Sequence, residues 1–197
     1  MIASLLLLAA SPVHADDGFA AVQIGSAAPA FELPNLDGET VKLADHKGKV
    51  VVLEWFNPGC PFVKQAHGPE GGLQSMANSW TDKGVVWLAI NSGSPGKQGT
   101  GIDTNKQAKK DWSMNHPVLL DESGTVGRSY AAKTTPQMVV IDPEGNQVYN
   151  GALDNAPFGK PKTDKLDPIT ERVLAAVTAG KASPQGQSKP YGCSVKY

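Results

Sequence analysis

Two apolar runs constrain the fold of this chain more than any other feature. Residues 49–56 and 84–91 are apolar at almost every position, whereas a strand with one face in water alternates apolar and polar residues. Both runs are therefore predicted to be strands covered on both faces. Between them, a helix is predicted to begin at Pro61, because proline suits the first helical turn. Gly68-Pro69 and Gly71-Gly72 interrupt it, and a second helix is expected over residues 73–80.

The rest of the chain continues this alternation of strands and helices. A hairpin is predicted at residues 31–43, helices at 102–112, 125–131 and 165–179, and strands at 117–120, 138–142 and 147–153. The last helix has apolar residues at helical spacing, beginning with Leu166. Strands that alternate with helices and end in an antiparallel hairpin predict an α/β fold. It has a central mixed β-sheet flanked by helices, an N-terminal β-hairpin and an extended C-terminal tail.

Length and charge limit the number of domains and the kinds of partner. The 197 residues suit one domain, and a formal net charge of −1 suggests neither a nucleic-acid nor a membrane-surface partner. Residues 1–15 have an apolar stretch and a small-x-small cleavage site, although no Lys or Arg precedes them. We predict a signal peptide at 1–15, a domain at 16–182 and a tail at 183–197. Export to the periplasm or outside the cell follows from that signal.

Cys60 directly follows the first apolar run and precedes Pro61. A cysteine at a helix N-terminus faces free backbone N–H groups, here those of Phe62 and Val63, which favour the thiolate. Pro58-Gly59 and Pro61 indicate a surface turn rather than a buried, inert position. We therefore predict that Cys60 is a reactive nucleophile.

Cys193 is the other cysteine, in the polar and proline-containing tail, which is predicted to be extended and mobile. Three interpretations stay open. Cys193 resolves an intermediate formed at Cys60; it forms a permanent disulfide with Cys60, worth about 4–5 kcal/mol; or it is an unrelated free thiol. The cysteines and histidines show no metal-ligand spacing, so neither a metal nor a cofactor is predicted.

Glu54 is a carboxylate within the first apolar run, six positions before Cys60. If it is buried, its pKa should rise, and it could relay protons to the thiol. Alternatively, it points outward at a sheet edge or pairs with a lysine. His67, two helical turns beyond Cys60, is predicted to face solvent. Pro136 opens a strand after Thr135, which is compatible with a cis bond.

These residues together resemble the thioredoxin superfamily, and within it the redoxin or peroxiredoxin-like branch. The resemblance runs from residue 24 to the tail and is carried by residues 54–64 and 190–197. It implies that Cys60 is the nucleophile, that Glu54 is the buried acid, and that Pro136 is the cis-proline beside the sulfur. With the Thr135 backbone, that proline would receive an extended substrate strand.

The departures from the family patterns narrow the expected activity. Val63 stands where a dithiol thioredoxin has its second cysteine, so Cys193 is the available resolving residue. Leu53, Asn57 and Pro136 stand where a peroxidatic site has a proline, a threonine or serine, and an arginine.

The predicted function is that of an oxidoreductase that carries out thiol-disulfide exchange with a protein partner. An external reductant is expected to supply its electrons. Trp55, Asn57, Pro61, Thr135 and Pro136 are expected to border its site. Peroxide reduction is the alternative substrate choice. A non-catalytic module with a structural Cys60–Cys193 disulfide is the alternative of another class, and Val63 speaks against a copper-delivery version of it.

Overall fold

The computed structural model describes residues 19–20 and 23–197 of the chain. The predicted signal peptide at residues 1–15 lies outside the described residues. Among the described residues, no helix has both the length and the apolar character that crossing a membrane requires.

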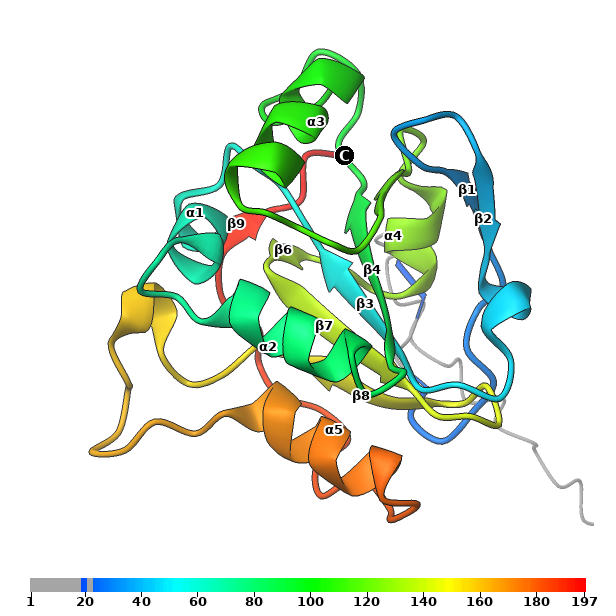
Figure 1. Ribbon diagram of the computed structural model, residues 1–197, viewed down its shortest axis with the longest axis vertical. Helices are drawn as coiled ribbons and strands as arrows, with labels where there is room; N and C mark the ends of the chain where they lie inside the picture. The colour runs from blue at the N-terminus through cyan, green and yellow to red at the C-terminus, as the bar shows by residue number, and fades with distance from the viewer. Residues whose placement is uncertain (1–18, 21–22) are drawn as a thin grey trace, which may run out of the picture.

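A five-stranded mixed sheet forms the centre of the fold, in the order β5-β4-β3-β7-β8 (Figure 1). Its strands are β3 (Val51–Trp55), β4 (Val86–Asn91), β5 (Val118–Leu120), β7 (Gln137–Ile141) and β8 (Gln147–Gly151). Strands β3, β4 and β5 are parallel, while β7 runs antiparallel to both β3 and β8. The predicted fold class is therefore confirmed.

Helices and two small sheets surround the central sheet. The helices are α1 (Pro61–His67), α2 (Leu73–Thr81), α3 (Ile102–Asp111), α4 (Thr125–Ser129) and α5 (Ile169–Thr178), with 3₁₀ turns η1 (Leu43–His46) and η2 (Pro157–Gly159). The small sheets pair β1 (Glu32–Pro34) with β2 (Thr40–Lys42), and β6 (Thr134–Thr135) with β9 (Cys193–Ser194). The first pair is the predicted N-terminal hairpin.

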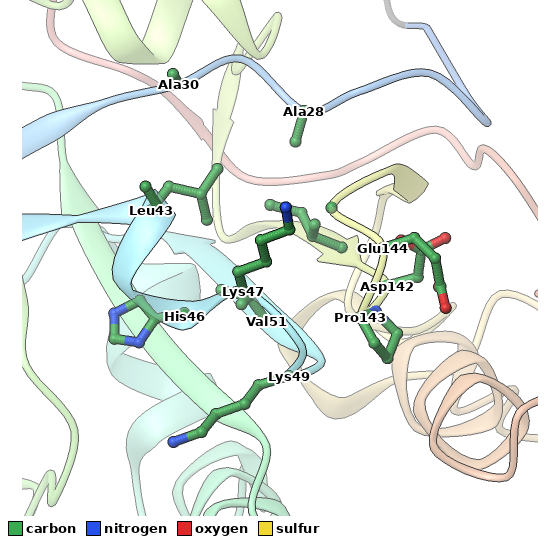
Figure 2. A pocket seen from close by; sticks show the side chains of 13 residues that line it. Ala28, Ala30, Leu43, His46, Lys47, Lys49, Val51, Asp142, Pro143 and Glu144 are labelled. Atoms are coloured by element: carbon green, nitrogen blue, oxygen red, sulfur yellow. The ribbon is translucent and has the colours of Figure 1, made fainter.

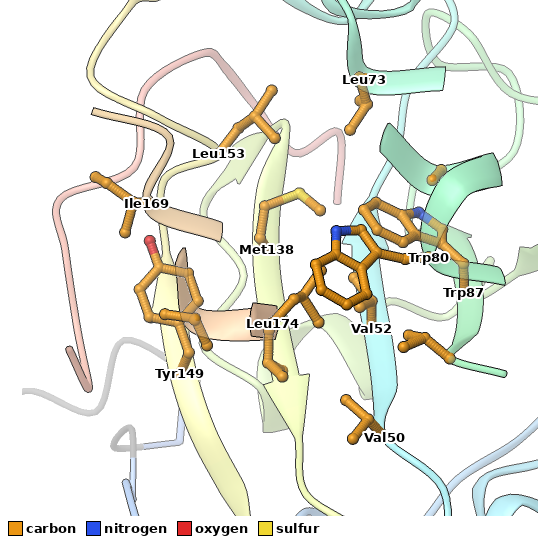
Figure 3. Close-up of a cluster of buried hydrophobic side chains, with 14 of the residues drawn as sticks. Val50, Val52, Leu73, Trp80, Trp87, Met138, Tyr149, Leu153, Ile169 and Leu174 are labelled. Carbon is orange, nitrogen blue, oxygen red and sulfur yellow. The ribbon is translucent and has the colours of Figure 1, made fainter. Parts of the chain in front are cut away.

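The alternation of side chains along β3 builds a core on each face of the sheet. On one face, Val52 belongs to a cluster with Trp80 of α2 and Leu174 of α5 (Figure 3). On the other face, Leu53 belongs to a cluster with Leu33 of β1 and residues of α4. Both faces of β3 are thus covered, as its continuous apolar run predicts.

The last helix is shorter than predicted. Helix α5 begins at Ile169, after Pro168, rather than at residue 165. Leu166 lies before the helix and is 56% exposed, so its predicted place on the buried face is wrong.

The tail is extended, as predicted, but it is anchored rather than mobile. Asn150 of β8 donates its backbone N–H to the Gly186 carbonyl at 2.9 Å. The Ser188 hydroxyl lies 2.6 Å from the Tyr149 hydroxyl and accepts the Ala152 N–H at 2.8 Å. These contacts direct the tail along β8 and past α1, to β9 beside β6 (Figure 1).

Candidate active site

The end of β3 and the start of α1 position Cys60. Cys60 is the N-cap of α1 and Pro61 is at its first turn, as predicted. The Cys60 N–H donates to the Asn57 carbonyl at 3.0 Å, and the Cys60 carbonyl accepts the Lys64 N–H at 2.9 Å. Cys60 is fully buried, whereas Pro61 beside it is exposed. The expectation of an exposed turn is wrong for Cys60.

The tail brings the second cysteine to the first. Cys60 and Cys193 are both free thiols, and their sulfur atoms lie 2.7 Å apart although 133 positions separate them in the chain. Strand β9 pairs antiparallel with β6, so that Cys193 lies opposite Thr135 and Ser194 opposite Thr134. The sulfur atoms are therefore within reach of a disulfide bond.

The peptide bond between Thr135 and Pro136 is cis. The residues alone showed only compatibility with this geometry, but the resemblance implied it, and the implied cis bond is confirmed. The Thr135 carbonyl oxygen lies 3.2 Å from the Cys60 sulfur, so that it can accept the thiol proton when Cys60 is protonated. The carbonyl, the proline ring and the two cysteines thus occupy one small region at the end of the sheet.

The two thiols differ in acidity. Burial raises the pKa of Cys60, but hydrogen bonds from the Cys193 thiol and the Val63 N–H favour its thiolate more strongly, so its pKa is lowered overall. Burial raises the pKa of Cys193 to about 11, and the hydrogen bond to Cys60 adds to this. The N–H of Phe62 faces Cys193 rather than Cys60. Of the two thiols, Cys60 is therefore the stronger acid and Cys193 the weaker one.

Glu54 lies inside the protein, on the central strand of the sheet. Its side chain is fully buried, and its carboxylate accepts hydrogen bonds from His67 Nε2 at 2.6 Å and from Trp87 Nε1 at 3.0 Å. Burial alone raises the pKa of Glu54, but the attraction of His67 outweighs it and the pKa is lowered overall. The prediction of a raised pKa is wrong because the histidine partner was not foreseen, and so are the sheet-edge and lysine-pair alternatives.

His67 is the residue that sequence reasoning misplaced. It is buried rather than facing solvent, and its ring stacks on Trp112 at 5.0 Å between centroids. A signal for this was available, since Val63, Ala66 and His67 share one helical face by their spacing, and all three are buried.

His116 lies near this pair and was also missed. It is 3% exposed, and its ring centroid lies 6.0 Å from that of Trp87. Burial lowers the pKa of His116 to about 4, although the Glu54 carboxylate acts in the opposite direction. His116 is therefore neutral at physiological pH.

Asn57 and the loop after β4 hold the Cys60 turn in place. The Asn57 amide accepts the Gly59 N–H at 2.7 Å and donates to the Gln98 carbonyl at 3.1 Å. The Gln98 side chain donates to the Gly59 carbonyl at 3.1 Å. The Ser94 N–H of the same loop donates to the Lys196 carbonyl at 2.8 Å. One loop thus fastens both the turn and the tail.

Trp55 points away from the face that carries Glu54. It is fully buried, its indole N–H donates to the Ser92 hydroxyl at 3.1 Å, and its ring packs against Tyr130 at 5.5 Å. Ser92 in turn donates to Asp121 at 2.7 Å. In this arrangement Trp55 supports the strand end that precedes the cysteine turn.

A hollow of about 220 Å³ lies at the opposite end of β3 from Cys60, lined by Lys47, Val51, Asp142 and their neighbours (Figure 2). Because the length of β3 lies between this hollow and the two thiols, the hollow is not part of the candidate active site. Within the described part of the chain, no group of three or more histidine, cysteine or acidic side chains is placed to hold a metal ion.

This chain is similar in sequence to known proteins that are named for two different activities. It is 30% identical over 134 residues to the thiol-disulfide oxidoreductase ResA of Bacillus subtilis, covering 66% of this chain and 68% of that protein. It is 29% identical over 113 residues to a protein of Coxiella burnetii named as the peroxiredoxin bcp, covering 55% and 66% respectively. Both names describe oxidoreductases.

A solved structure resembles nearly the whole chain. An uncharacterized conserved protein from Geobacillus kaustophilus superposes with a TM-score of 0.77 at 31% identity, covering 90% of this chain and 93% of that one. Residues 24–149, more than half of the sequence, match the AhpC/TSA family. The chain is an oxidoreductase and belongs to the AhpC/TSA family.

Proposed function

We propose that this protein is a thiol-disulfide oxidoreductase in which the Cys60 thiolate attacks a disulfide and Cys193 resolves the intermediate. The observation that carries the proposal is the 2.7 Å approach of the two free thiols at the cis-proline. The lowered pKa of Cys60 and the raised pKa of Cys193 assign the nucleophile and the resolving thiol. The similarity to a protein named thiol-disulfide oxidoreductase supports the same reaction.

The reaction has two exchange steps. In the first, the Cys60 thiolate attacks one sulfur of a partner disulfide, forms a mixed disulfide and releases the other partner sulfur as a thiolate. In the second, Cys193 loses its proton and attacks the Cys60 sulfur, which forms the Cys60–Cys193 disulfide and releases the second partner thiol. The partner disulfide gains two electrons and the protein dithiol loses two. An external dithiol then restores the reduced protein.

Glu54 is in this proposal the buried acid of the strand that leads to the nucleophile. His67 lowers its pKa and keeps it ionised, which makes it a weak base, so the proton that Cys193 loses goes to the departing partner thiolate instead. Thr135 and Pro136 border the sulfur on the partner's side. Asn57 holds the turn that carries Cys60.

Peroxide reduction is a less favourable interpretation of the same site. A peroxidatic thiolate needs donors that polarise the peroxide bond, and Pro136 stands where such a site has an arginine, which leaves the Val63 N–H and the second thiol as donors at Cys60. A permanent structural disulfide is the alternative role for the same pair, and the different pKa values of the two thiols favour exchange over it. Export remains part of the proposal and rests on the sequence of residues 1–15. Mass spectrometry of the cell-fractionated protein would test it by locating the mature N-terminus.

Stopped-flow tryptophan fluorescence tests the choice of oxidant. The reduced protein is mixed either with a small disulfide or with hydrogen peroxide, and Cys60→Ser is the control. We expect a fast fluorescence change with the disulfide, a slow one with peroxide, and none with the control. A faster reaction with peroxide would replace this proposal by thiol peroxidase activity, and a lack of reaction with both would remove the enzymatic role of Cys60.

A further inference from the structure

The strand that covers the thiols belongs to the protein's own tail. Cys193 is paired with Thr135 in the β6–β9 ladder, and the Val195 N–H donates to the Lys133 carbonyl at 3.1 Å, which extends the pairing by one step. Adding an extended segment to an exposed strand is a common way to bind a polypeptide. Here the edge that lies beside Cys60 is already occupied.

The position before Cys193 requires glycine. Gly192 has a φ of 140°, and a Cβ on it would collide with the carbonyl oxygen of Thr135. A residue with a side chain in this place would push the strand away from β6. A strand that pairs with β6 can therefore bring a cysteine sulfur to Cys60 when the residue before that cysteine is glycine.

After Cys193, the side chains of Val195 and Tyr197 pack into two pockets on the same side of the β6–β9 pair. Val195 is 9% exposed and belongs to the hydrophobic cluster of Leu53 and Tyr130. Because the side chains of a strand alternate, the residue two positions further on points the same way. That residue is Tyr197.

The pocket that holds the Tyr197 ring fits that side chain closely. A Cβ on Gly124 or on Gly127 would collide with the tyrosine side chain, so both glycines leave room for it. The Arg128 guanidinium lies 4.2 Å from the ring centroid, and the Tyr197 hydroxyl donates to the Ala132 carbonyl at 2.6 Å. An aromatic residue four positions after the cysteine is thus recognised by shape, by a cation and by a hydrogen bond.

We infer that residues 192–197 are a built-in copy of the substrate strand. They occupy the edge at which a protein partner docks an extended segment of the pattern glycine, cysteine, any residue, aliphatic, any residue, aromatic. The inference rests on the proposed function, and it adds the partner's sequence class and a means of regulation. The partner displaces the tail to reach Cys60, and the returning tail expels the product when Cys193 forms its disulfide.

The competition between tail and partner has a measurable consequence. When only the fraction of molecules with an open edge can bind, the apparent affinity for the partner is reduced by that fraction. Weakening the tail without touching the thiols therefore speeds the reaction with a partner peptide. Tyr197→Ala does this and also leaves the pocket of the aromatic ring free for the peptide.

The experiment uses full-length protein with Cys193→Ser, so that Cys60 is the sole thiol and the mixed disulfide is trapped. The probe is the hexapeptide Gly-Cys-Ser-Val-Lys-Tyr with its cysteine joined to thionitrobenzoate. Attack by Cys60 transfers the peptide to the Cys60 sulfur and releases coloured thionitrobenzoate. The rate is measured for Cys193→Ser alone, with added Tyr197→Ala, and with added Lys189→Ala, a control at an exposed tail position.

We expect Tyr197→Ala to raise the peptide rate about tenfold, the equivalent of about 1.4 kcal/mol in the docking of the tail. Lys189→Ala should leave the rate unchanged. In the Tyr197→Ala protein, peptides with alanine in place of the glycine or of the tyrosine should react several-fold more slowly. Gly192→Ala weakens the docking of the tail at the residue before Cys193, so it should raise the rate as well. This second variant keeps the test valid if one of the two variants folds poorly.

The outcomes separate the two proposals. If none of these proteins releases thionitrobenzoate faster than a protein with both Cys60→Ser and Cys193→Ser, the proposed function itself fails. If Cys60 reacts but all three peptides react alike, the recognition of sequence is refuted. A small probe without a peptide, the mixed disulfide of mercaptoethanol and thionitrobenzoate, is tested as well. If Tyr197→Ala speeds its reaction as much as that of the peptide, the tail only covers Cys60 and the inference is overturned.

Discussion

His116 should make the protein lose stability in mild acid. Its ring is buried beside Trp87, and neither ring nitrogen has a hydrogen-bond partner among the described residues. Protonation would place an uncompensated charge there, and burial accordingly lowers the pKa of His116 to about 4. Glu54 opposes this effect, while His67 and Lys109 reinforce it.

The sign and size follow from proton linkage. Between pH 6.5 and pH 4, the unfolded chain binds a proton at His116 and the folded protein does not, so unfolding is favoured progressively as the pH falls. The difference between about 6.5 and about 4 corresponds to about 3 kcal/mol, at 1.36 kcal/mol per pH unit. Above pH 6.5 this contribution to stability is complete. The lowered pKa of Glu54 adds a separate loss at lower pH, as the pH falls below about 4.

The test compares the natural protein with His116→Phe, which keeps an aromatic ring against Trp87. Urea unfolding is followed by tryptophan fluorescence at pH 7, 5.5 and 4. The natural protein should lose about 3 kcal/mol more than the variant, or about 1.5 M in urea midpoint at a slope of about 2 kcal/mol per M. His46, whose pKa is also lowered by burial, is common to both and cancels. Equal losses in the two proteins would refute the assignment.

Three further substitutions test the site. His67→Leu should lower the free energy of unfolding by about 3–5 kcal/mol, because it leaves the Glu54 charge buried and unpaired; adding Glu54→Gln should recover part of the loss, and no recovery would deny the pairing. Cys193→Ala should raise the pH midpoint of Cys60 alkylation by iodoacetamide, because it removes the donor that favours the thiolate; an unchanged midpoint would contradict that cause. Asn57→Ala should cost about 2 kcal/mol in urea unfolding, since it removes two hydrogen bonds of a buried side chain; a loss below about 0.5 kcal/mol would show that the turn holds without it.

The sequence was sufficient for the architecture because local patterns determine it. The apolar runs of β3 and β4 predicted strands covered on both faces, and Pro61 marked the start of α1 correctly. The element order then left few arrangements open. The predicted domain limits at residues 16–182 and 183–197 remain predictions.

The contacts around the thiols depended on partners that no local pattern reveals. The pKa of Glu54 was predicted in the wrong direction, because a residue 13 positions away supplies the compensating imidazole. The burial of Cys60 was missed because residues from distant parts of the chain pack around it, among them Cys193, 133 positions further on. The tail was predicted to be mobile from its polar composition, whereas Ser188 and Tyr197 anchor it by single well-placed side chains.

Trapping the reaction intermediate tests the central claim most directly. The reduced natural protein and Cys193→Ser are each mixed with a protein disulfide substrate, quenched in acid, alkylated and analysed by peptide mass spectrometry. The account predicts a Cys60–Cys193 disulfide and released substrate thiols in the natural protein, and a Cys60–substrate mixed disulfide in the variant. A mixed disulfide that persists in the natural protein, or alkylation of both cysteines after turnover, would contradict it.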